Sequence, residues 1–196
     1  MSGKLLNRHE IEAEVASGQL RVEPFDPTHF RPASYVLCLG RRFRRWQACE
    51  VPIRLWSERA ADGRLAEPVE CDEIVIDPGE FMLASTSESV GLSVDRWALI
   101  SPLSHIARFG LSIHCGADFV SPGFGMARAA PLTLELCNHN SSPLALTAGM
   151  PIAHLRIGQV DGSGAPPASI YERIDPLTPS RFFEDMSGTY LLRRPL

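Results

Sequence analysis

Lysine is nearly missing from this chain of 196 residues: Lys4 is the only one, and every other basic side chain that is permanently charged is an arginine. The net charge of −4 is not the basic balance that a general nucleic-acid binder shows. No apolar run reaches the roughly 18 residues that a membrane helix needs, and the first residues contain no hydrophobic region of a signal peptide. We therefore expect no nucleic-acid partner, no membrane partner and a cytoplasmic location.

Clustered metal ligands are also missing from the sequence. The five cysteines are scattered with no CxxC pair, and the six histidines lack tight ligand spacing. Structural zinc sites usually show such spacing. We expect free thiols, and each histidine taken alone is expected to be a surface or hydrogen-bonded residue. No protein-bound metal is predicted, although a metal-dependent hydrolytic site stays an open alternative.

Several motifs with a known chemistry do not occur in the chain. There is no GxxxxGK[ST], no GxGxxG after a predicted strand, no GxSxG, and no H-x-E followed by P-C-x-x-C. These absences exclude P-loop nucleotide hydrolases, dinucleotide-binding folds, hydrolases with a nucleophile elbow, and zinc-dependent deaminases.

One helix is clearly indicated near the N-terminus. Asn7 can cap it, and Glu10 follows three residues later, as in a capping box. Ile11 and Val15 then fall at i and i+4, and Gly18 is a natural stop. The segment 20–32 is broken by three prolines, so we predict an extended loop there.

Most of the remaining chain is predicted to form strands, because short alternating or apolar segments are separated by Gly, Pro, Asn and Ser. The segments are 33–46, 73–85 (two runs around a Pro-Gly turn), 97–103, 110–116, 132–138, 144–150 and 152–158. A short helix is expected over 104–110. Many short strands at this spacing indicate an antiparallel sandwich or barrel. We predict a mainly β domain with a short N-terminal helix over residues 1–160, and a C-terminal arm of the same domain over 161–196.

An arginine-rich run from Arg41 to Arg45 reads RRFRR. On a strand, these side chains divide between the two faces. A solvated edge strand is the favoured interpretation, because charge on an edge prevents unwanted pairing. The alternative is a contact with a phosphate group.

The stretch LTLELCN contains the most interesting carboxylate of the chain. Leu132, Leu134 and Leu136 point one way from the predicted strand, and Glu135 points the other way. Taken alone, this pattern favours a solvated carboxylate, since most strand carboxylates are exposed. A carboxylate that is held in a pocket to move protons is the alternative.

The segment just before that strand is rich in polar and glycine residues. Ser104 and Arg108 lie four residues apart, so on a short helix they share a face, and both can donate hydrogen bonds to an anion. A turn serine and an unrelated surface arginine are the alternative interpretation. Gly116, Gly123 and Gly125 indicate a close approach of the backbone to another group.

In this region the sequence resembles the dCTP deaminase family of the dUTPase-like superfamily. SHIARFGLSIHCGADFVSPGFG is similar to the family pattern G-[RK]-S-S-x-A-R-x-G-L-x-x-H…A-x-x-I-D-P-G-[FW], and LTLELCN to the strand that bears the catalytic glutamate. The stretches LLNRHEIEAEVASGQLRVEPFDPTHFRPASYVLCLG, IVIDPGEFMLAST and PLALTAGMPIAHL extend the resemblance over most of the chain. It implies a distorted β jelly roll and a homotrimer with active sites between subunits. It also implies hydrolysis of dCTP to dUTP and ammonia without zinc, with Mg²⁺ accompanying the triphosphate.

By position, Glu135 matches the glutamate that takes a proton from water and delivers it to the ring. Ser104 and Arg108 match the residues that hold the water and polarise the site. Ala117 matches a small residue beside the reacting ring, and Phe124 matches a bulky residue against the deoxyribose. The full set of residues expected to bind the substrate is His105, Cys115, Gly116, Ala117, Ser121, Phe124, His154 and Tyr171.

The chain departs from the family pattern where phosphates are held. Pro102, Leu103 and His105 replace a glycine, a basic residue and the second serine. Ser121 replaces the aspartate that is the general base of dUTPases, which argues against dUTP hydrolysis. Other departures are Val36 for an aspartate, His154 for a glutamine, an apparent insertion at Met126 to Pro131, and an arm that lacks the usual lysine and glutamine but contains Arg193 and Arg194.

Four functions fit these observations. The first is a deaminase acting on dCTP, because the three residues assigned to the chemistry are present. The second is an enzyme of the same fold acting on another cytosine nucleotide, because the departures cluster at phosphate-binding positions. The third is a non-catalytic nucleotide-binding or structural relative. A plain dUTPase is the fourth and is disfavoured by Ser121.

Overall fold

The structure is a computed structural model that describes residues 4–57, 63–162, 175–182 and 184. Its helical elements are α1 (Arg8–Ser17), the 3₁₀ helix η1 (Pro27–His29) and α2 (Ser104–Ala107). Its strands are β1 (Lys4–Leu5), β2 (Leu20–Glu23), β3 (Phe30–Arg31), β4 (Ser34–Arg45), β5 (Val69–Glu70), β6 (Glu73–Ile76), β7 (Phe81–Leu92), β8 (Arg96–Pro102), β9 (Leu111–Ser112), β10 (Phe119–Val120), β11 (Ala130–Asn138), β12 (Leu144–Thr147) and β13 (Pro151–Gln159).

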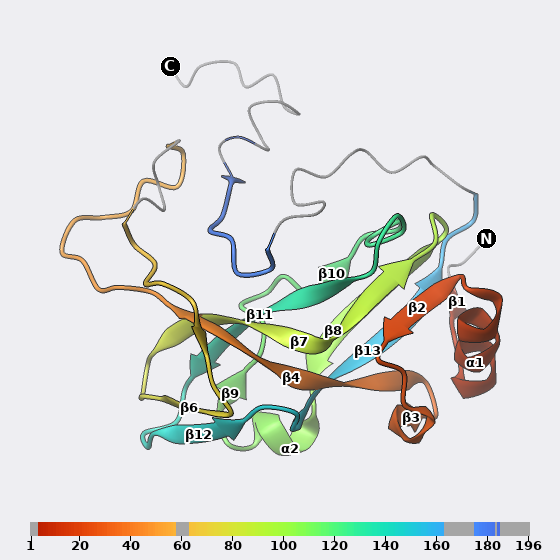
Figure 1. Cartoon of the computed structure of the whole chain (residues 1–196), viewed down its shortest axis with the longest axis horizontal. Coiled ribbons are helices and arrows are strands. Elements are labelled where there is room, and N and C mark those ends of the chain that lie inside the picture. Colours follow the sequence, from red (N-terminus) through yellow and green to blue (C-terminus); the bar gives the residue numbers. More distant parts are fainter. Residues whose placement is uncertain (1–3, 58–62, 163–174, 183, 185–196) are drawn as a thin grey trace.

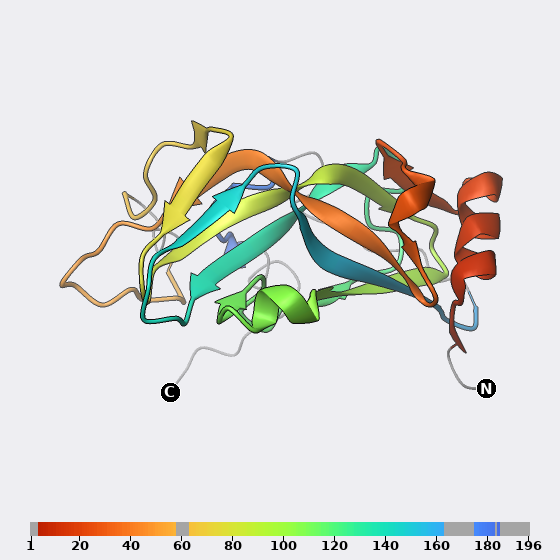
Figure 2. The ribbon, with the colours of Figure 1, turned by 90° about the horizontal axis from the view of Figure 1, so that it is seen from below.

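The described strands form one large curled antiparallel sheet and a separate pair (Figures 1 and 2). The order in the large sheet is β10-β8-β13-β4-β7-β11-β9, with β2 added to β7, β1 to β13, and β3 and β5 to β4. Strands β6 and β12 pair with each other at the opposite end of the molecule from α1. Apolar side chains from the inner faces of these strands pack into one main core. The prediction of a mainly β fold is confirmed.

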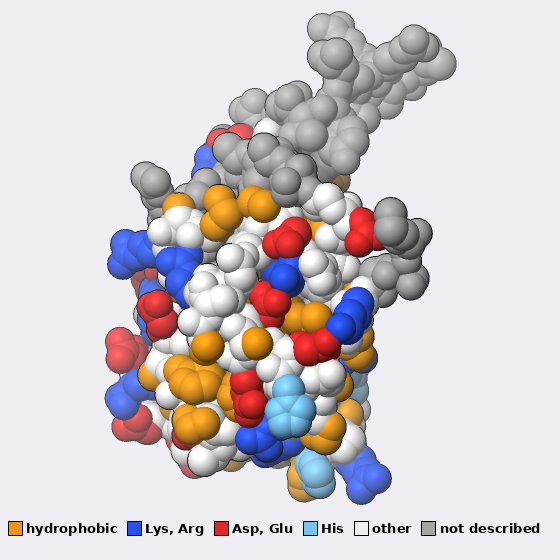
Figure 3. Space-filling view, turned by 90° about the vertical axis from the view of Figure 1, so that its right-hand side faces the viewer, with side chains coloured by type: hydrophobic (Ala, Val, Ile, Leu, Met, Phe, Trp, Pro, Cys, Tyr) orange, Lys and Arg blue, Asp and Glu red, His pale blue; other side chains and the backbone are white. Residues whose placement is uncertain are grey.

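The N-terminal helix α1 has the predicted caps. The Glu10 N–H donates to Asn7 Oδ1 at 3.1 Å, and the Asn7 N–H donates to Glu10 Oε2 at 2.9 Å. Gly18 ends the helix in the left-handed region, with φ of 75°. The helix buries only Ile11 completely and leaves its polar side exposed. Figure 3, which views this end of the molecule, shows acidic, basic and apolar side chains interspersed.

The prediction of an extended loop over 20–32 is wrong. Leu20 and Val22 are buried on alternate positions of β2, which pairs with β7. The prolines do not interrupt this pairing, because they lie between the elements or, for Pro27, at the start of η1, where no backbone donor is needed. A proline count therefore hid two short strands and a 3₁₀ turn.

The arginine run lies inside the sheet, so the edge-strand prediction is wrong. Phe43 of β4 pairs with Ala84 of β7 on one side and with Val69 of β5 on the other. Each arginine instead has a local partner: Arg41 forms an ion pair with Asp72 at 2.7 Å, and Arg45 forms one with Glu80. Neighbouring carboxylates and carbonyls, rather than an unpaired edge, accommodate this charge.

The other predicted strands are largely confirmed, with shifted ends. The segment 110–116 contains only the two-residue β9, while β5 and β10 were not predicted. The Met126–Pro131 segment ends inside β11, which starts at Ala130. All five cysteines are free thiols, as expected. None of the helices in the described ranges is long and apolar enough to cross a membrane.

Candidate functional site

Glu135 lies in the middle of β11 and points away from the core. Leu132, Leu134 and Leu136 are buried on the inner face, at 5%, 0% and 0% exposure. Glu135 is half-buried on the other face, between the exposed Thr133 and the half-buried Cys137. The predicted alternation is confirmed, but the carboxylate is less exposed than that alternation alone suggested.

The segment that follows β9 holds the Glu135 carboxylate. The Cys115 N–H donates to Glu135 Oε2 at 2.8 Å, and the Glu135 N–H donates to the Ile113 carbonyl at 2.9 Å. Gly116 and Ala117 come next and are exposed. Desolvation raises the pKa of the Cys115 thiol, and the negative charge of Glu135 raises it further. The structure thus brings the predicted residues Cys115 and Glu135 into direct contact.

A row of side chains crosses three strands at the level of Glu135. Glu135 of β11 pairs with Leu83 of β7, which pairs with Arg44 of β4. Leu177 from the C-terminal part of the chain packs on Leu83, and its carbonyl accepts a hydrogen bond from Arg44 Nη1 at 3.0 Å. The Thr133 hydroxyl donates to the Pro176 carbonyl at 2.7 Å. Pro176 and Leu177 of the C-terminal arm therefore lie on the same face as Glu135.

Helix α2 carries the other predicted catalytic residues. Ser104, His105 and Arg108 are all exposed, and the Arg108 N–H donates to the Ser104 carbonyl at 3.2 Å. The expected short helix is confirmed. Within the described part of the chain, no hydrogen bond or ion pair joins Ser104 or Arg108 to Glu135. The structure places the serine and the arginine on one turn but does not connect them to the carboxylate.

The glycine-containing loop after β10 packs closely against strand β7. A Cβ atom on Gly125 would lie 2.3 Å from the Val90 carbonyl oxygen of β7, and Gly125 has φ of 60°. The predicted close approach is confirmed there, although the partner is a strand. Gly116 has φ of 115° and open space around it. In the same loop Ser121 is exposed, while Phe124 is half-buried against the main core.

His154 lines an open depression of about 380 Å³ between β3, β4, β8 and β13. The lining residues are Arg31, Pro32, Ala33, Ser34, Ser101, His154 and Arg156. Ser34 Oγ and His154 Nδ1 lie 3.0 Å apart, at hydrogen-bond distance. Burial lowers the pKa of His154, and the charges of Arg31 and Arg156 lower it further. Two guanidinium groups beside a neutral imidazole can bind an anion.

The arginines of this depression were missed from the sequence. Arg156 follows His154 by two positions on β13, so the strand alternation could have placed both on one face. Arg156 Nε is buried and has no hydrogen-bond partner in the described structure. In the sheet order, β4 and β7 separate β13 from β11, so the depression and Glu135 are two distinct groups in one protomer. Tyr171 lies outside the described residues.

Comparison with known proteins shows to which family the chain is related. A family model described as dCTP deaminase-like matches residues 5–160. A protein from Thermobifida fusca named "dCTP deaminase, dUMP-forming" is 33% identical over 192 residues, which is 94% of this chain and 96% of the relative. A protein of the same name from Methanoculleus marisnigri is 35% identical over 157 residues, covering 80% and 81% of the two chains.

A solved structure supports the fold. The crystal structure of 2'-deoxycytidine 5'-triphosphate deaminase from Agrobacterium tumefaciens superposes with a TM-score of 0.62 over 82% of this chain, at 22% identity. This chain covers 49% of that longer chain. The likeness of the folds, together with the curled antiparallel sheet, confirms the predicted jelly-roll-like architecture.

Proposed function

Because the chain belongs to the dCTP deaminase-like family, we propose that it removes the 4-amino group of the cytosine base of dCTP by hydrolysis. The observation that carries the proposal is the Glu135 carboxylate, which points out of the sheet and is held at 2.8 Å by the Cys115 N–H. A fixed, half-buried carboxylate on an open face is suited to general base catalysis.

In the proposed reaction, a water molecule adds to C4 of the cytosine ring. Glu135 accepts the proton that the water loses and passes it to the ring. The C4 hydroxyl then gives its proton to Glu135, which passes it to the amino nitrogen. The bond from C4 to that nitrogen breaks, ammonia leaves, and the oxygen of the water remains as the C4 carbonyl. The hydrogen bond from Cys115 keeps one carboxylate oxygen in place, so the other is free to face the water.

Ser104 and Arg108 supply the polar donors of the proposed site. Both are exposed on α2, and neither contacts Glu135 within the described protomer. We therefore propose that α2 of one copy faces β11 of the next, in the homotrimer that the resemblance to the dCTP deaminase family implies. This arrangement accounts for the exposure of Ser104 and Arg108 and for the outward direction of the half-buried Glu135, since a neighbouring copy completes each of them.

The triphosphate requires positive charge that Leu103 does not provide. The loss of one charged phosphate contact costs about 1.5–3 kcal/mol, which is roughly a ten- to hundredfold loss of affinity. Arg31 and Arg156 in the His154 depression offer two replacements. Mg²⁺ is expected to arrive with the triphosphate as its counterion, and no residue of the chain is assigned to it. Removal of Mg²⁺ with EDTA should therefore weaken dCTP binding and turnover.

The product separates two versions of this function. Relatives of similar length are named dUMP-forming, which favours a second hydrolysis to dUMP and pyrophosphate. Ser121 lacks the carboxylate expected for that second step, which favours release of dUTP. We place dUTP first on this chemical ground. Chromatography of the products after complete turnover distinguishes the two, and dUMP as the main product would overturn this choice.

The decisive assay follows ammonia release from dCTP, dCMP, CTP and 5-methyl-dCTP with the purified chain. Turnover of dCTP that disappears in Glu135→Gln supports the proposal. Glu70→Gln is the matched control, because Glu70 is exposed on β5 and lies away from the proposed site. Turnover of a different cytosine nucleotide alone would identify a divergent enzyme. Nucleotide binding without any turnover would identify a non-catalytic relative.

A further inference from the structure

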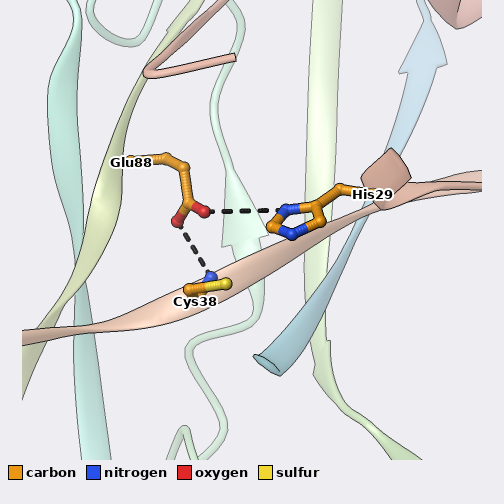
Figure 4. Close-up of side chains that lie close together, drawn as sticks. All are labelled: His29, Cys38 and Glu88. Carbon is orange, nitrogen blue, oxygen red and sulfur yellow. Dashed lines mark hydrogen bonds and ion pairs between the residues drawn. The ribbon is translucent and has the colours of Figure 1, made fainter. Parts of the chain in front are cut away.

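A second group of reactive side chains lies inside the fold and includes none of the residues assigned to catalysis. His29 of η1, Cys38 of β4 and Glu88 of β7 converge there (Figure 4). One donor atom from each, a ring nitrogen, the sulfur and a carboxylate oxygen, lies within 4.8 Å of the other two. Cys38 and Glu88 are buried, at 7% and 3% exposure. The group therefore combines nitrogen, sulfur and oxygen donors in a space that is largely closed to water.

Within the described residues, Glu88 has no lysine or arginine partner that would compensate its burial. Its Oε2 atom accepts hydrogen bonds from the Cys38 N–H at 2.9 Å and from the Ser87 hydroxyl at 3.1 Å. Its Oε1 atom lies 3.9 Å from His29 Nδ1, and the Cys38 thiol also hydrogen-bonds the carboxylate. No described lysine or arginine pairs with it. Buried carboxylates are usually paired with a cation or bound to a metal ion. One oxygen of Glu88 is thus left for a positive group.

The His29 ring is oriented by a carboxylate on each side. Nε2 faces Asp26 Oδ2 at 4.0 Å, and Nδ1 faces Glu88 Oε1 at 3.9 Å. Nδ1 is buried and has no hydrogen-bond partner among the residues that the structure describes. A direct charge-assisted hydrogen bond would be about 2.7–2.9 Å long. The separation is closer to that of two ligands on one tetrahedral ion, which at zinc bond lengths stand roughly 3.3–3.7 Å apart.

Irregular strand pairing creates the space for this group. Between the pairs Leu39↔Thr86 and Phe43↔Ala84 the register of β4 and β7 shifts. The β7–β11 register shifts too, close to the same place. The Cys38 N–H consequently donates to the side chain of Glu88 on β7 rather than to a backbone carbonyl of a neighbouring strand. The broken ladder lets a carboxylate and a thiol meet between two central strands.

We propose that a Zn²⁺ ion binds between His29 Nδ1, Cys38 Sγ and Glu88 Oε1 as a structural site. The mixed nitrogen, sulfur and oxygen donor set suits zinc. Asp26 Oδ2 lies 4.0 Å from Nε2, and it would hold a zinc-bound imidazole in the correct tautomer once the two atoms close to hydrogen-bond distance. The His29 side chain is 23% exposed, so a water molecule can complete the coordination from that side. The Cys38 thiol releases one proton on binding, and the ion fixes η1 to β4 and β7.

Cobalt(II) is the probe for this site, because a cobalt–thiolate bond absorbs in the near ultraviolet. The full-length protein is treated with a chelator, dialysed and titrated with Co²⁺. We expect a thiolate band that saturates at one equivalent and disappears when Zn²⁺ is added. Cys38→Ser should abolish the band, while Cys71→Ser, the matched control on a half-buried cysteine outside the group, should retain it. Asp26→Asn should weaken Co²⁺ binding by about 10–100-fold.

The wild-type protein alone can overturn the proposal, so the test does not depend on the folding of a variant. Absence of a thiolate band in wild-type protein would do so. A band that survives in Cys38→Ser, or that is lost equally in Cys71→Ser, would also contradict the site. As an independent readout, bound Zn²⁺ should protect Cys38 from alkylation in a peptide-level mass measurement and leave Cys49 unprotected.

Discussion

Glu135 and Glu88 are carboxylates of the same curled sheet in opposite surroundings. Glu135 is half-buried, its Oε2 accepts one backbone hydrogen bond, and within the described residues no hydrogen bond is made to its other oxygen. Glu88 is 3% exposed and receives two hydrogen bonds on one oxygen, between strands whose pairing is irregular. The regular alternation of β11 places the Glu135 side chain on the outer face of the sheet. The register shifts of β7 accompany the burial of the Glu88 side chain. On the proposals made above, the first carboxylate serves chemistry and the second serves the fold.

The largest expected effect is on activity at the open carboxylate. Glu135→Gln keeps the size of the side chain and an acceptor for the Cys115 N–H but cannot take a proton. We expect kcat for deamination to fall by about 10²–10⁴, with an unchanged midpoint of urea unfolding. Steady-state kinetics and urea titration on the same preparation check both parts. A clear fall in the midpoint of urea unfolding would instead make Glu135 a structural residue, like Glu88.

The buried carboxylate should show the reverse pattern. Glu88→Met fills a similar volume but leaves the Cys38 N–H without its acceptor. An unsatisfied buried donor costs about 1–3 kcal/mol, so the free energy of unfolding should fall by that amount, measured by urea titration. The folded variant should keep the wild-type kcat. A variant as stable as wild type, or one that folds fully but does not turn over, would contradict the assignment.

A smaller effect concerns the thiol beside Glu135. The charge of Glu135 raises the pKa of Cys115, so removing it in Glu135→Gln should lower that pKa and increase the thiolate fraction at pH 8. Alkylation of Cys115 should become roughly two- to fivefold faster. Cys49 is the internal reference, because the Val51 N–H lowers its pKa and no change is made near it. A slower reaction of Cys115 would show that Glu135 does not act on this thiol.

The smallest effect is the titration of His154. Burial, together with Arg31 and Arg156, keeps the pKa of His154 below the ordinary value of 6.5. The ring should therefore be neutral at pH 7 and titrate at a lower pH in NMR spectra. Inorganic phosphate in the depression should raise the pKa, because an anion favours the charged ring. A midpoint at or above 6.5 without phosphate would contradict the proposed environment.

The parts of the fold that could be predicted are those with regular local patterns. The caps of α1, the alternation of β11 and the turn around Gly79 each follow from short-range rules. The β2 strand and the pairing of the arginine run could not be predicted, because both depend on which distant strands lie alongside. The prolines beside β2 indicated a loop, and the arginines within β4 indicated an edge strand, and both local indications were wrong.

The candidate site was predicted as residue types but not as an arrangement. Glu135 and Cys115 were each named as site residues, and the structure brings them into contact because they lie on adjoining segments of one sheet edge. The separation of Ser104 and Arg108 from Glu135 could not be read from their spacing. Of the proposed zinc ligands, His29 and Cys38 lie close in the sequence but on different elements, and Glu88 follows Cys38 by 50 positions, so no motif spacing predicts the group.

The central claim is that Glu135 of one copy and the Ser104–Arg108 turn of a neighbouring copy together form one deamination site. Glu135→Gln and Arg108→Ala are each expected to be inactive on dCTP. Mixed, unfolded and refolded together, random trimers should regain about a quarter of the wild-type rate of ammonia release, because that fraction of sites combines an intact Glu135 with an intact Arg108. A mixture that stays at the rate of the separate variants, or an Arg108→Ala variant that is fully active by itself, would contradict the account.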